Sequence, residues 1–299
     1  MNPSAKPVLE LDDDKSLAPV NHDGDVVVKN LVSEGRVLQV GGSLTVGGAI
    51  EAAHVTVAGP VTVAGGIIGK TKGRYTIGGE LQCRFITGGA LITRARVQVS
   101  GEVVHSRLTC TGRLDVSGVI YGGDIAANGG VSCKSLGQAS SVPTLIEAGE
   151  GRTMRLLTES IAPQIDANNK RAAAIRSTTG PLLQRMKTLS PEQREKVTEL
   201  LSEADELEAT TANLTTAYEH RRRLIRQQAD AKITVADVVY AGVTVRFGAI
   251  EAVLASPIRG PLTLTTRKGD GPTEIVIVDS TDGSVCVLPS RLADLATAA

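Results

Sequence analysis

Residues 42–66 read GSLTVGGAIEAAHVTVAGPVTVAGG, a stretch in which short alternating apolar runs are separated by glycine pairs and other small residues. The same pattern recurs from residue 24 to residue 149. Self-similarity of this kind is the sequence signature of a solenoid, in which each repeat forms one coil and stacks on its neighbours. We therefore predict a solenoid for this part of the chain.

The repeat can be divided after its glycine corners into 42–59, 60–79, 80–101, 102–118 and 119–137, which are pieces of 17 to 22 residues. Short strands in coils of this length predict a parallel β-helix, with coils stacked at ~4.8 Å, the hydrogen-bonding distance between strands. The variable coil length favours the right-handed form, because a left-handed β-helix keeps a stricter hexapeptide step. Alternation places inside the coils Leu44, Val46, Ile50, Val55, Val57, Val61 and Val63.

The amino-acid composition fits a solenoid with a narrow interior. Of the 299 residues, 41% are hydrophobic but only 2% are aromatic, so Val, Ile, Leu and Ala supply the buried surface. Basic and acidic residues balance, with 32 Lys plus Arg and 32 Asp plus Glu. The chain therefore has no net positive charge that would attract nucleic acid or an anionic membrane. We therefore predict protein partners, including self-association into a homo-oligomer, with no nucleic acid and no cofactor.

The cysteines and the N-terminal residues indicate the compartment. Cys83, Cys110, Cys133 and Cys286 are scattered without a CxxC pair, which is typical of buried or bystander thiols in a reducing compartment. The first residues have neither a basic region nor an apolar run, and no window approaches ~18 apolar residues. We predict a cytoplasmic protein with no integral membrane segment.

The distribution of glycine separates a glycine-rich first half from a glycine-poor second half, because 24 of the 32 glycines precede residue 151. We predict a disordered lead at 1–23, the parallel β-helix at 24–150 and an antiparallel coiled-coil hairpin at 151–230. A returning β segment at 231–290 then packs on the β-helix, and a frayed or helical tail follows at 291–299. The returning strands are expected to cover the open end of the solenoid, where strand edges and apolar interior would otherwise be exposed.

Residues 153–229 carry two sets of heptads, each with a pair of apolar rows typical of coiled-coil helices. In the first helix the rows are Ile161, Asn168, Ile175, Leu182 and Leu189, with Ile165, Ala172, Thr179 and Met186. In the second helix they are Val197, Ala204, Thr211, Tyr218 and Ile225, with Leu200, Leu207 and Leu214. At ~1.5 Å rise per residue, helices of ~35 residues reach ~50 Å, which predicts an arm.

The joint between the helices spans 189–193 and carries helix-start signals. Ser190 fits an N-cap, Pro191 the first helical position, and Gln193 completes a capping box. A joint this short predicts an antiparallel hairpin. Gly180-Pro181 predicts a kink or break in the first helix, because proline lacks a backbone donor and clashes with the preceding turn.

Several short phrases occur in a distinctive order on both sides of the predicted helices. They are Val104-His-Ser106, Gly118-Val-Ile-Tyr-Gly-Gly-Asp-Ile-Ala126, Ser135-Leu-Gly137, Thr144-Leu-Ile-Glu-Ala-Gly149, Ala231-Lys-Ile-Thr-Val235 and Tyr240-Ala-Gly-Val-Thr-Val245. In this combination the chain resembles, over roughly residues 25 to 250, the FapA (flagellar assembly protein A) family of bacteria. The resemblance implies a right-handed β-helix with a coiled-coil insertion, and a non-enzymatic, cytoplasmic part in placing or assembling flagella.

The chain departs from the family pattern at its start. Family members usually carry a sizeable domain before the β-helix, whereas about 24 residues precede it here, so functions of that domain are not carried over. The leading hypothesis is a scaffold or assembly protein whose β-helix self-associates or docks laterally and whose arm engages another protein. One alternative is a bactofilin-like element that polymerises end to end. Another is a hexapeptide-type acyltransferase or carbonic-anhydrase-like enzyme, which would require clustered histidines.

Two motifs could indicate a phosphate-binding or a metal-binding site, but we assign both a structural role. Residues 64–71, AGGIIGKT, fit a relaxed phosphate-loop pattern ending in Lys70 and Thr71, but another strand follows where the helix should begin. His54 and His105 lie three predicted coils apart, or ~14 Å at ~4.8 Å per coil. A shared metal ion needs ligands at ~2.0 to 2.3 Å, so we predict none.

Two surfaces remain as candidates for partner binding, both in the hairpin. The first is the tip of the hairpin, and the second is the one basic cluster, which acidic residues of the same helix balance. The tip candidates are Leu189, Ser190, Pro191, Glu192 and Glu195, and the basic cluster is His220, Arg221, Arg222 and Arg223.

Overall fold

The computed structural model describes residues 8–12, 18–140, 142–227, 231–268 and 272–293. The chain forms two compact units. One is a parallel β-solenoid of about 8 turns that ends in antiparallel strands, and the other, Met154–Gln227, is a pair of helices. The prediction of a mainly β chain with an α insertion is therefore confirmed.

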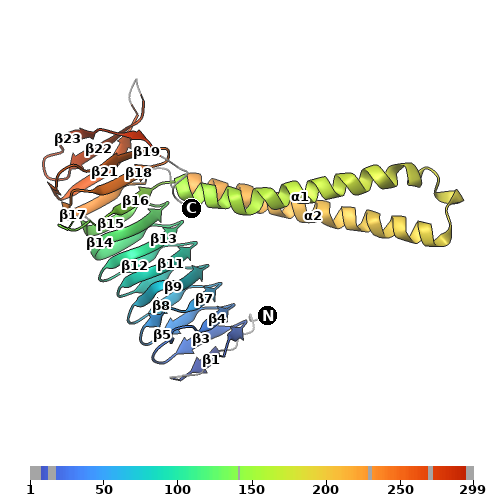
Figure 1. Cartoon of the computed structure of the whole chain (residues 1–299), viewed down its shortest axis with the longest axis horizontal. Helices are drawn as coiled ribbons and strands as arrows, with labels where there is room; N and C mark the ends of the chain where they lie inside the picture. Colours follow the sequence, from blue (N-terminus) through green and yellow to red (C-terminus); the bar gives the residue numbers. More distant parts are fainter. Residues whose placement is uncertain (1–7, 13–17, 141, 228–230, 269–271, 294–299) are drawn as a thin grey trace, which may run out of the picture. The chain divides into compact units, whose positions relative to one another are not determined.

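The strands of the solenoid pair in three parallel rows (Figure 1). The first row contains β1 (Val8–Leu11), β3 (Asp25–Val28), β5 (Leu44–Val46), β8 (Val61–Val63), β10 (Leu81–Cys83), β12 (Val97–Val99), and parts of β14 (Leu114–Ala127), β15 (Val131–Leu136) and β17 (Ile233–Val239). The second contains β6 (Ile50–Glu51) and the leading parts of β9 (Ile67–Ile77), β11 (Ile86–Thr93) and β13 (Val103–Cys110). The third contains β2 (Val20–His22), β4 (Val37–Val40), β7 (His54–Val57), the ends of those longer strands, β16 (Thr144–Ala148) and β18 (Val243–Phe247).

Register along the first row sets the coil length. The aligned residues Leu44, Val61, Leu81, Val97 and Leu114 follow one another at steps of 16 to 20 residues. The seven residues that alternation places inside, from Leu44 to Val63, are all at most 2% exposed. Period-two alternation therefore identified the interior of these coils correctly, and aliphatic layers stack on one another as the composition indicates.

The corner between the second and third rows requires an unusual backbone. Gly88 and Gly122 adopt positive φ there, in the left-handed region that favours glycine. Lys70 and His105 stand at the equivalent positions of neighbouring coils and adopt the same conformation, with φ of 49° and 47°. A non-glycine residue in this region costs about 1–3 kcal/mol, and the conformation persists only where the surrounding structure imposes it. The His105 ring packs edge-on against Tyr121 of the next coil, 5.6 Å away.

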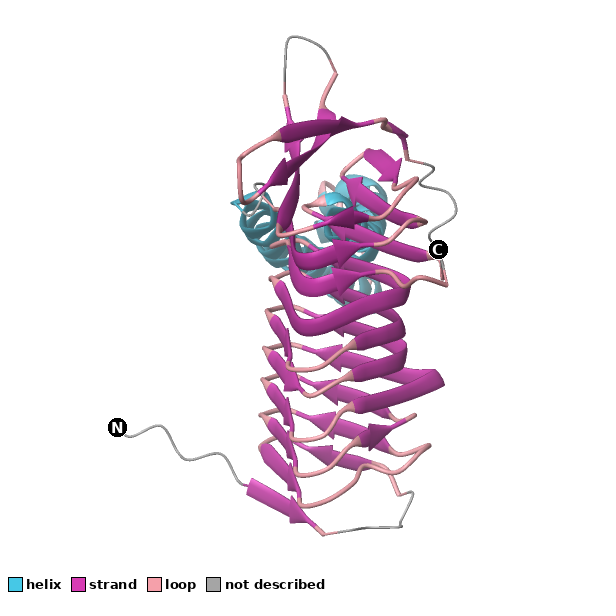
Figure 2. Cartoon of the chain, turned by 90° about the vertical axis from the view of Figure 1, so that its left-hand side faces the viewer, coloured by secondary structure: helices cyan, strands magenta, loops and turns pink. Residues whose placement is uncertain are grey.

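The segment after the helices first continues the solenoid and then closes it (Figure 2). β17 and β18 pair in parallel with β15 and β16, so they form one more coil. The remaining strands pair in antiparallel fashion, and β19, β20 and β21 occupy the outer edges of β18 and β17. These strands are β19 (Ile250–Val253), β20 (Ile258–Arg259), β21 (Leu262–Arg267), β22 (Glu274–Asp279), β23 (Val285–Leu288) and β24 (Arg291–Leu292).

The solenoid begins earlier than the sequence led us to expect. The stretches 8–11 and 20–22 form β1 and β2, so the expectation of disorder over 1–23 does not hold for them. β1 pairs with β3 and β2 with β4, which supplies the backbone partners that an isolated polar segment would lack. The expected frayed or helical tail likewise begins with a strand, β24, and residues 294–299 lie outside the described residues.

The helical unit is an antiparallel hairpin of α1 (Gly151–Leu183) and α2 (Pro191–Gln227). Thr158 Oγ1 lies 3.3 Å from Tyr218 Oη, and Arg176 Nε donates to Glu208 Oε1 at 3.0 Å. Later residues of α1 thus meet earlier residues of α2, so the two helices run in opposite directions. Every predicted heptad position whose side chain is described is buried or half-buried. The fully packed ones are Ile161, Ala172, Thr179, Val197, Ala204 and Thr211.

The first helix ends before the predicted joint. α1 continues through Pro181 and ends at Leu183, and a 3₁₀ turn, Met186–Thr188, follows. The predicted break is therefore displaced by two residues. Proline removes the amide that would bond the carbonyl four residues back, while the residues after it keep their own donors. The joint is 184–190 and is longer than the sequence suggested.

Candidate functional site

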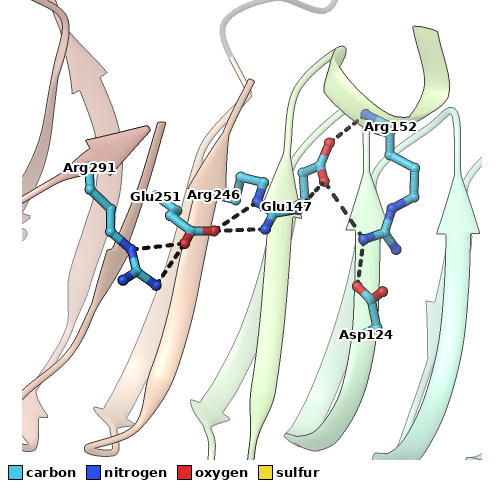
Figure 3. Close-up of polar contacts among 6 residues, drawn as sticks. All are labelled: Asp124, Glu147, Arg152, Arg246, Glu251 and Arg291. Carbon is cyan, nitrogen blue, oxygen red and sulfur yellow. Dashed lines mark hydrogen bonds and ion pairs between the residues drawn. The ribbon is translucent and has the colours of Figure 1, made fainter. Parts of the chain in front are cut away.

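A row of charged side chains crosses the third strand row at the C-terminal end of the solenoid (Figure 3). Glu147 on β16 lies opposite Arg246 on β18, Arg246 opposite Glu251 on β19, and Glu251 opposite Arg291 on β24. The charges alternate in sign along this line. We call these four residues, together with Asp124 and Arg152, the charged row.

The centre of the charged row is buried. The side chains of Glu147, Arg246 and Glu251 are at most 6% exposed, whereas Arg291 at the outer end is 75% exposed. Glu251 accepts hydrogen bonds from Arg246 Nη2 at 2.7 Å and from Arg291 Nε at 3.1 Å. Arg246 Nη1 lies 3.8 Å from Glu147 Oε2. Each buried carboxylate therefore has a cation beside it, which burial of a charge requires.

The inner end of the charged row holds the first turn of α1. The backbone amide of Arg152 donates to Glu147 Oε1, and the Arg152 guanidinium lies 3.7 Å from Glu147 Oε2 and 2.7 Å from Asp124 Oδ1. A carboxylate at a helix start satisfies an amide without an intrahelical partner and interacts favourably with the helix dipole. The charged row therefore fixes the residues at which the chain leaves the solenoid strand β16.

Two opposing effects set the pKa of Glu251. Burial acts to raise it, but hydrogen bonds from Arg246 and Arg291 act in the opposite direction and hold the pKa below the ordinary value of a glutamate. Glu251 is therefore ionised at neutral pH and keeps both arginines in place.

At the predicted hairpin tip, the capping box is present as the sequence predicts. Ser190 N–H donates to Gln193 Oε1 at 3.0 Å, and Gln193 N–H donates to Ser190 Oγ at 3.3 Å. Pro191 is the first residue of α2. Arg194, which the sequence did not single out, donates to the carbonyl oxygens of Leu189 and Lys187, both at 3.0 Å. Ser190, Pro191, Glu192 and Glu195 are exposed and Leu189 is half-buried, so the tip is a fixed polar surface.

The predicted basic cluster lies near the C-terminal end of α2. His220, Arg221, Arg222 and Arg223 are consecutive on α2, and consecutive helical residues point in different directions. Arg222 Nη1 lies 3.4 Å from Glu219 Oε1, one turn earlier. The cluster is therefore spread around a solvated helix, with part of its charge balanced locally.

Lys70 of the phosphate-loop-like motif and the two histidines lie in strands of the solenoid. Lys70 is inside strand β9, no helix follows it, and its ammonium lies 2.5 Å from Glu34 Oε2 and 3.8 Å from Glu51 Oε2. His54 and His105 are three coils apart, as the register from His54 through Arg74 and Ala90 to Arg107 shows. Among the described residues, no three His, Cys, Asp or Glu side chains gather as a metal site.

The four cysteines are free thiols, three buried and one exposed. Burial raises the pKa of Cys83 and of Cys133 to about 12, and that of Cys110 is raised as well. Thiolate formation is therefore suppressed at these three positions, which leaves Cys286 as the accessible thiol.

An open groove follows the corner between the first and second strand rows. Gly101 and Gly118 lie in its lining, with Phe85 and Tyr240 among the larger side chains. No local pattern in the sequence marks this groove, because its lining residues come from separate coils. Its ionisable lining is mixed in sign and so selects neither anions nor cations: Arg84 and Lys134, with Glu102 and Asp237.

Sequence reasoning also missed the charged row. Alternation places Glu147, next to the inward Ile146, and Arg246, next to the inward Val245, on the outside of the coil. Both are nevertheless buried, because Glu147 and Arg246 lie on neighbouring strands, with Arg152 beside Glu147 and Glu251 beside Arg246. No local signal marks this arrangement, since the register joins strands almost a hundred residues apart.

The fold defines a parallel β-solenoid protein with an inserted helical hairpin. The chain belongs to the flagellar assembly protein A family, because the model of that family's β-solenoid domain matches residues 7–271. This match includes β1, the hairpin and the final coil. No curated protein and no solved structure matches the chain. No helix among the described residues combines the length and the apolar character needed to cross a membrane.

Proposed function

We propose that this protein is a non-enzymatic scaffold in flagellar placement or assembly, acting in the cytoplasm through protein–protein contacts. The observation that supports this proposal most strongly is the family match over residues 7–271, which includes both the solenoid and the hairpin. The free thiols fit a reducing compartment. The solenoid supplies a stable body, and the hairpin supplies the surface that a partner contacts.

The hairpin tip is the proposed contact surface. Its conformation is set before any partner binds, because the capping box and the two Arg194 bonds fix residues 187–194. A surface that is already ordered loses less conformational entropy on binding. Exposed Glu192 and Glu195 lie beside exposed Arg185, Lys187, Arg194 and Lys196, so this surface offers charges of both signs to a partner.

The proposal is tested in a flagellated bacterium whose own family member has been deleted. The full chain is expressed beside a variant in which residues 154–227 are replaced by a short Gly/Ser loop, and beside Glu192→Lys/Glu195→Lys. We expect the full chain to restore flagellar number and position and to retain partner proteins in a pull-down. Both variants should lose these effects, whereas a control, Arg221→Ala/Arg223→Ala, should keep them. Full activity without the hairpin would refute a role for the tip.

A bactofilin-like filament is the alternative that the end of the solenoid argues against. End-to-end stacking needs open strand edges, but β20 and β21 pair with the outer edge of β17, and β19 pairs with that of β18. A further coil therefore has no place to pair at this end. Ordered filaments of the purified chain in electron micrographs would contradict the scaffold proposal, and stoichiometric acyl-CoA or metal binding would favour the enzyme alternative.

A further inference from the structure

The strand β23 is an unprotected edge in the antiparallel layer. Within the part of the chain that the structure describes, β23 pairs only with β22, so its other side faces no strand. The segment 283–289 reads GSVCVLP and contains no charged residue. Natural sheets usually protect such edges with charges, bulges or covering segments. The edge strand at the opposite end, β1, follows this rule, because it carries Glu10 and Asp12 follows it.

The side chains of β23 are also unusually apolar for their exposure. Val285 is 50% exposed and Val287 is 43% exposed, and Cys286 between them is exposed too. Val253 and Leu292, in the same C-terminal segment, are exposed as well. An uncharged apolar edge with unpaired backbone groups is the feature through which strands of separate chains pair.

The direction of the backbone groups follows from the pairing with β22. Asp279 N–H donates to the Ser284 carbonyl, and Ile277 lies opposite Cys286 in the same register. Antiparallel strands alternate between hydrogen-bonded and non-hydrogen-bonded pairs. Ser284 and Cys286 therefore direct their carbonyl groups toward β22. Val285 and Val287 direct their N–H and C=O groups toward the free edge.

This edge is complementary to itself. In an antiparallel pair of β23 strands centred on Cys286, Val285 exchanges two hydrogen bonds with the partner's Val287, and Val287 does the same with the partner's Val285. The two Cys286 residues become a non-hydrogen-bonded pair, whose Cα atoms lie ~4.5 Å apart.

We propose that this protein forms a two-fold symmetric dimer by antiparallel pairing of the β23 edge, Val285–Leu288, with the same edge of a second copy. No charge repels the two edges, and the exposed valines become cross-strand neighbours. The proposal is independent of the flagellar role, because it depends only on the edge and its register.

The central cysteine provides a built-in probe of this register. A Cα separation of ~4.5 Å lies within the range of ~4.4–6.8 Å that a disulfide spans. Mild oxidation should therefore join two chains through Cys286, with each thiol losing its hydrogen to the added oxidant, diamide. The other three cysteines are buried and their thiols are held protonated, so they do not compete.

The experiment uses the purified full chain at micromolar concentration. With diamide, non-reducing electrophoresis should show a species of twice the 31.1 kDa chain mass, and Cys286→Ser should abolish it. Sedimentation of Cys286→Ser, which keeps the edge but lacks the thiol, should still show a reversible dimer. Val287→Lys should raise the dimer dissociation constant at least tenfold, whereas Val253→Lys, at an equally exposed valine on β19, should leave it within twofold.

A second variant separates pairing from folding. Val287→Pro removes only an N–H that faces the free edge, which an edge strand tolerates, so circular dichroism should stay unchanged while the dimer is lost. A wild-type chain that sediments as a monomer and does not cross-link would overturn the proposal and leave the edge to a strand of a different protein. A dimer that survives Val287→Pro and Val287→Lys would overturn it as well.

Discussion

The solenoid and the hairpin solve the same problem of burial in different ways. In the solenoid, side chains alternate with period two, each coil hydrogen-bonds to the next, and residues such as Leu81, Leu114 and Ile120 are fully buried. In the hairpin, a heptad seam buries only a narrow line, in which Ala172 and Ala204 are among the packed residues. The difference indicates that stability resides in the solenoid, while the hairpin is free to serve binding.

The ion pairs of Arg246 are buried in the solenoid and those of Arg176 are exposed in the hairpin, and removing them should give the largest difference in unfolding free energy between the two regions. Arg246→Met leaves the buried carboxylates of Glu147 and Glu251 without their shared cation, which should lower the free energy of unfolding by about 3–5 kcal/mol. Arg176→Met removes exposed hairpin pairs with Asp205 and Glu208 and should lower the free energy of unfolding far less, because solvent screens these charges. Urea unfolding followed by circular dichroism measures both, and equal losses would contradict the comparison.

Core truncations test the comparison through apolar packing. Leu114→Ala removes a side chain that is 0% exposed between two coils and should cost about 2–5 kcal/mol, because the neighbouring layers cannot fully collapse onto the cavity. Leu207→Ala, at a half-buried seam position of the hairpin, should cost about 1 kcal/mol. Thermal unfolding compares the two variants. A larger loss from Leu207→Ala would mean that the hairpin seam, and not the coil interior, carries the stability.

The capping box at the hairpin tip should have a smaller, local effect. Ser190→Ala removes the side-chain acceptor for the Gln193 amide and should destabilise the start of α2 by about 1 kcal/mol. Ser202→Ala, at an exposed position within α2, is the matched control and should be neutral or slightly stabilising. Amide exchange at residues 191–195 reads out the difference. Unchanged exchange in Ser190→Ala would show that the cap does not order the tip.

The smallest expected effect is a pH dependence from Glu251. Its folded pKa lies below its unfolded value, so its stabilising contribution is fully present above the unfolded pKa and is lost as pH falls through the folded pKa. Arg246 and Arg291 lie beside it, and the next carboxylate in the row is Glu147. Wild type should lose more stability between pH 7 and acidic pH than Glu251→Gln. Parallel pH profiles of the two proteins would contradict this assignment.

The sequence predicted both regular patterns well. Period-two alternation identified the interior of the coils, and the heptads identified the buried line of the hairpin down to Thr179 and Thr211, two polar residues. Both succeed because the spacing of apolar residues along one segment determines which face is buried. The capping box of Ser190 and Gln193 was equally predictable, since it depends on residues three apart.

What the sequence could not predict depends on pairing between distant segments. β1 is a short Val-Leu-Glu-Leu run followed by three aspartates in the sequence, and it is a strand because β3 offers it backbone partners in register. The charged row depends on β16 and β18 becoming neighbours across the whole hairpin insertion, and the edge of β23 depends on the order of antiparallel strands. Local spacing contains no information about such registers.

Hydrogen exchange of the intact chain tests most directly the claim that stability resides in the solenoid. Amides of the parallel strands from β5 to β16 should exchange together and slowly, while amides of α1 and α2 within residues 154–227 should exchange more than about tenfold faster. Hairpin amides as protected as those of the solenoid strands would contradict the claim.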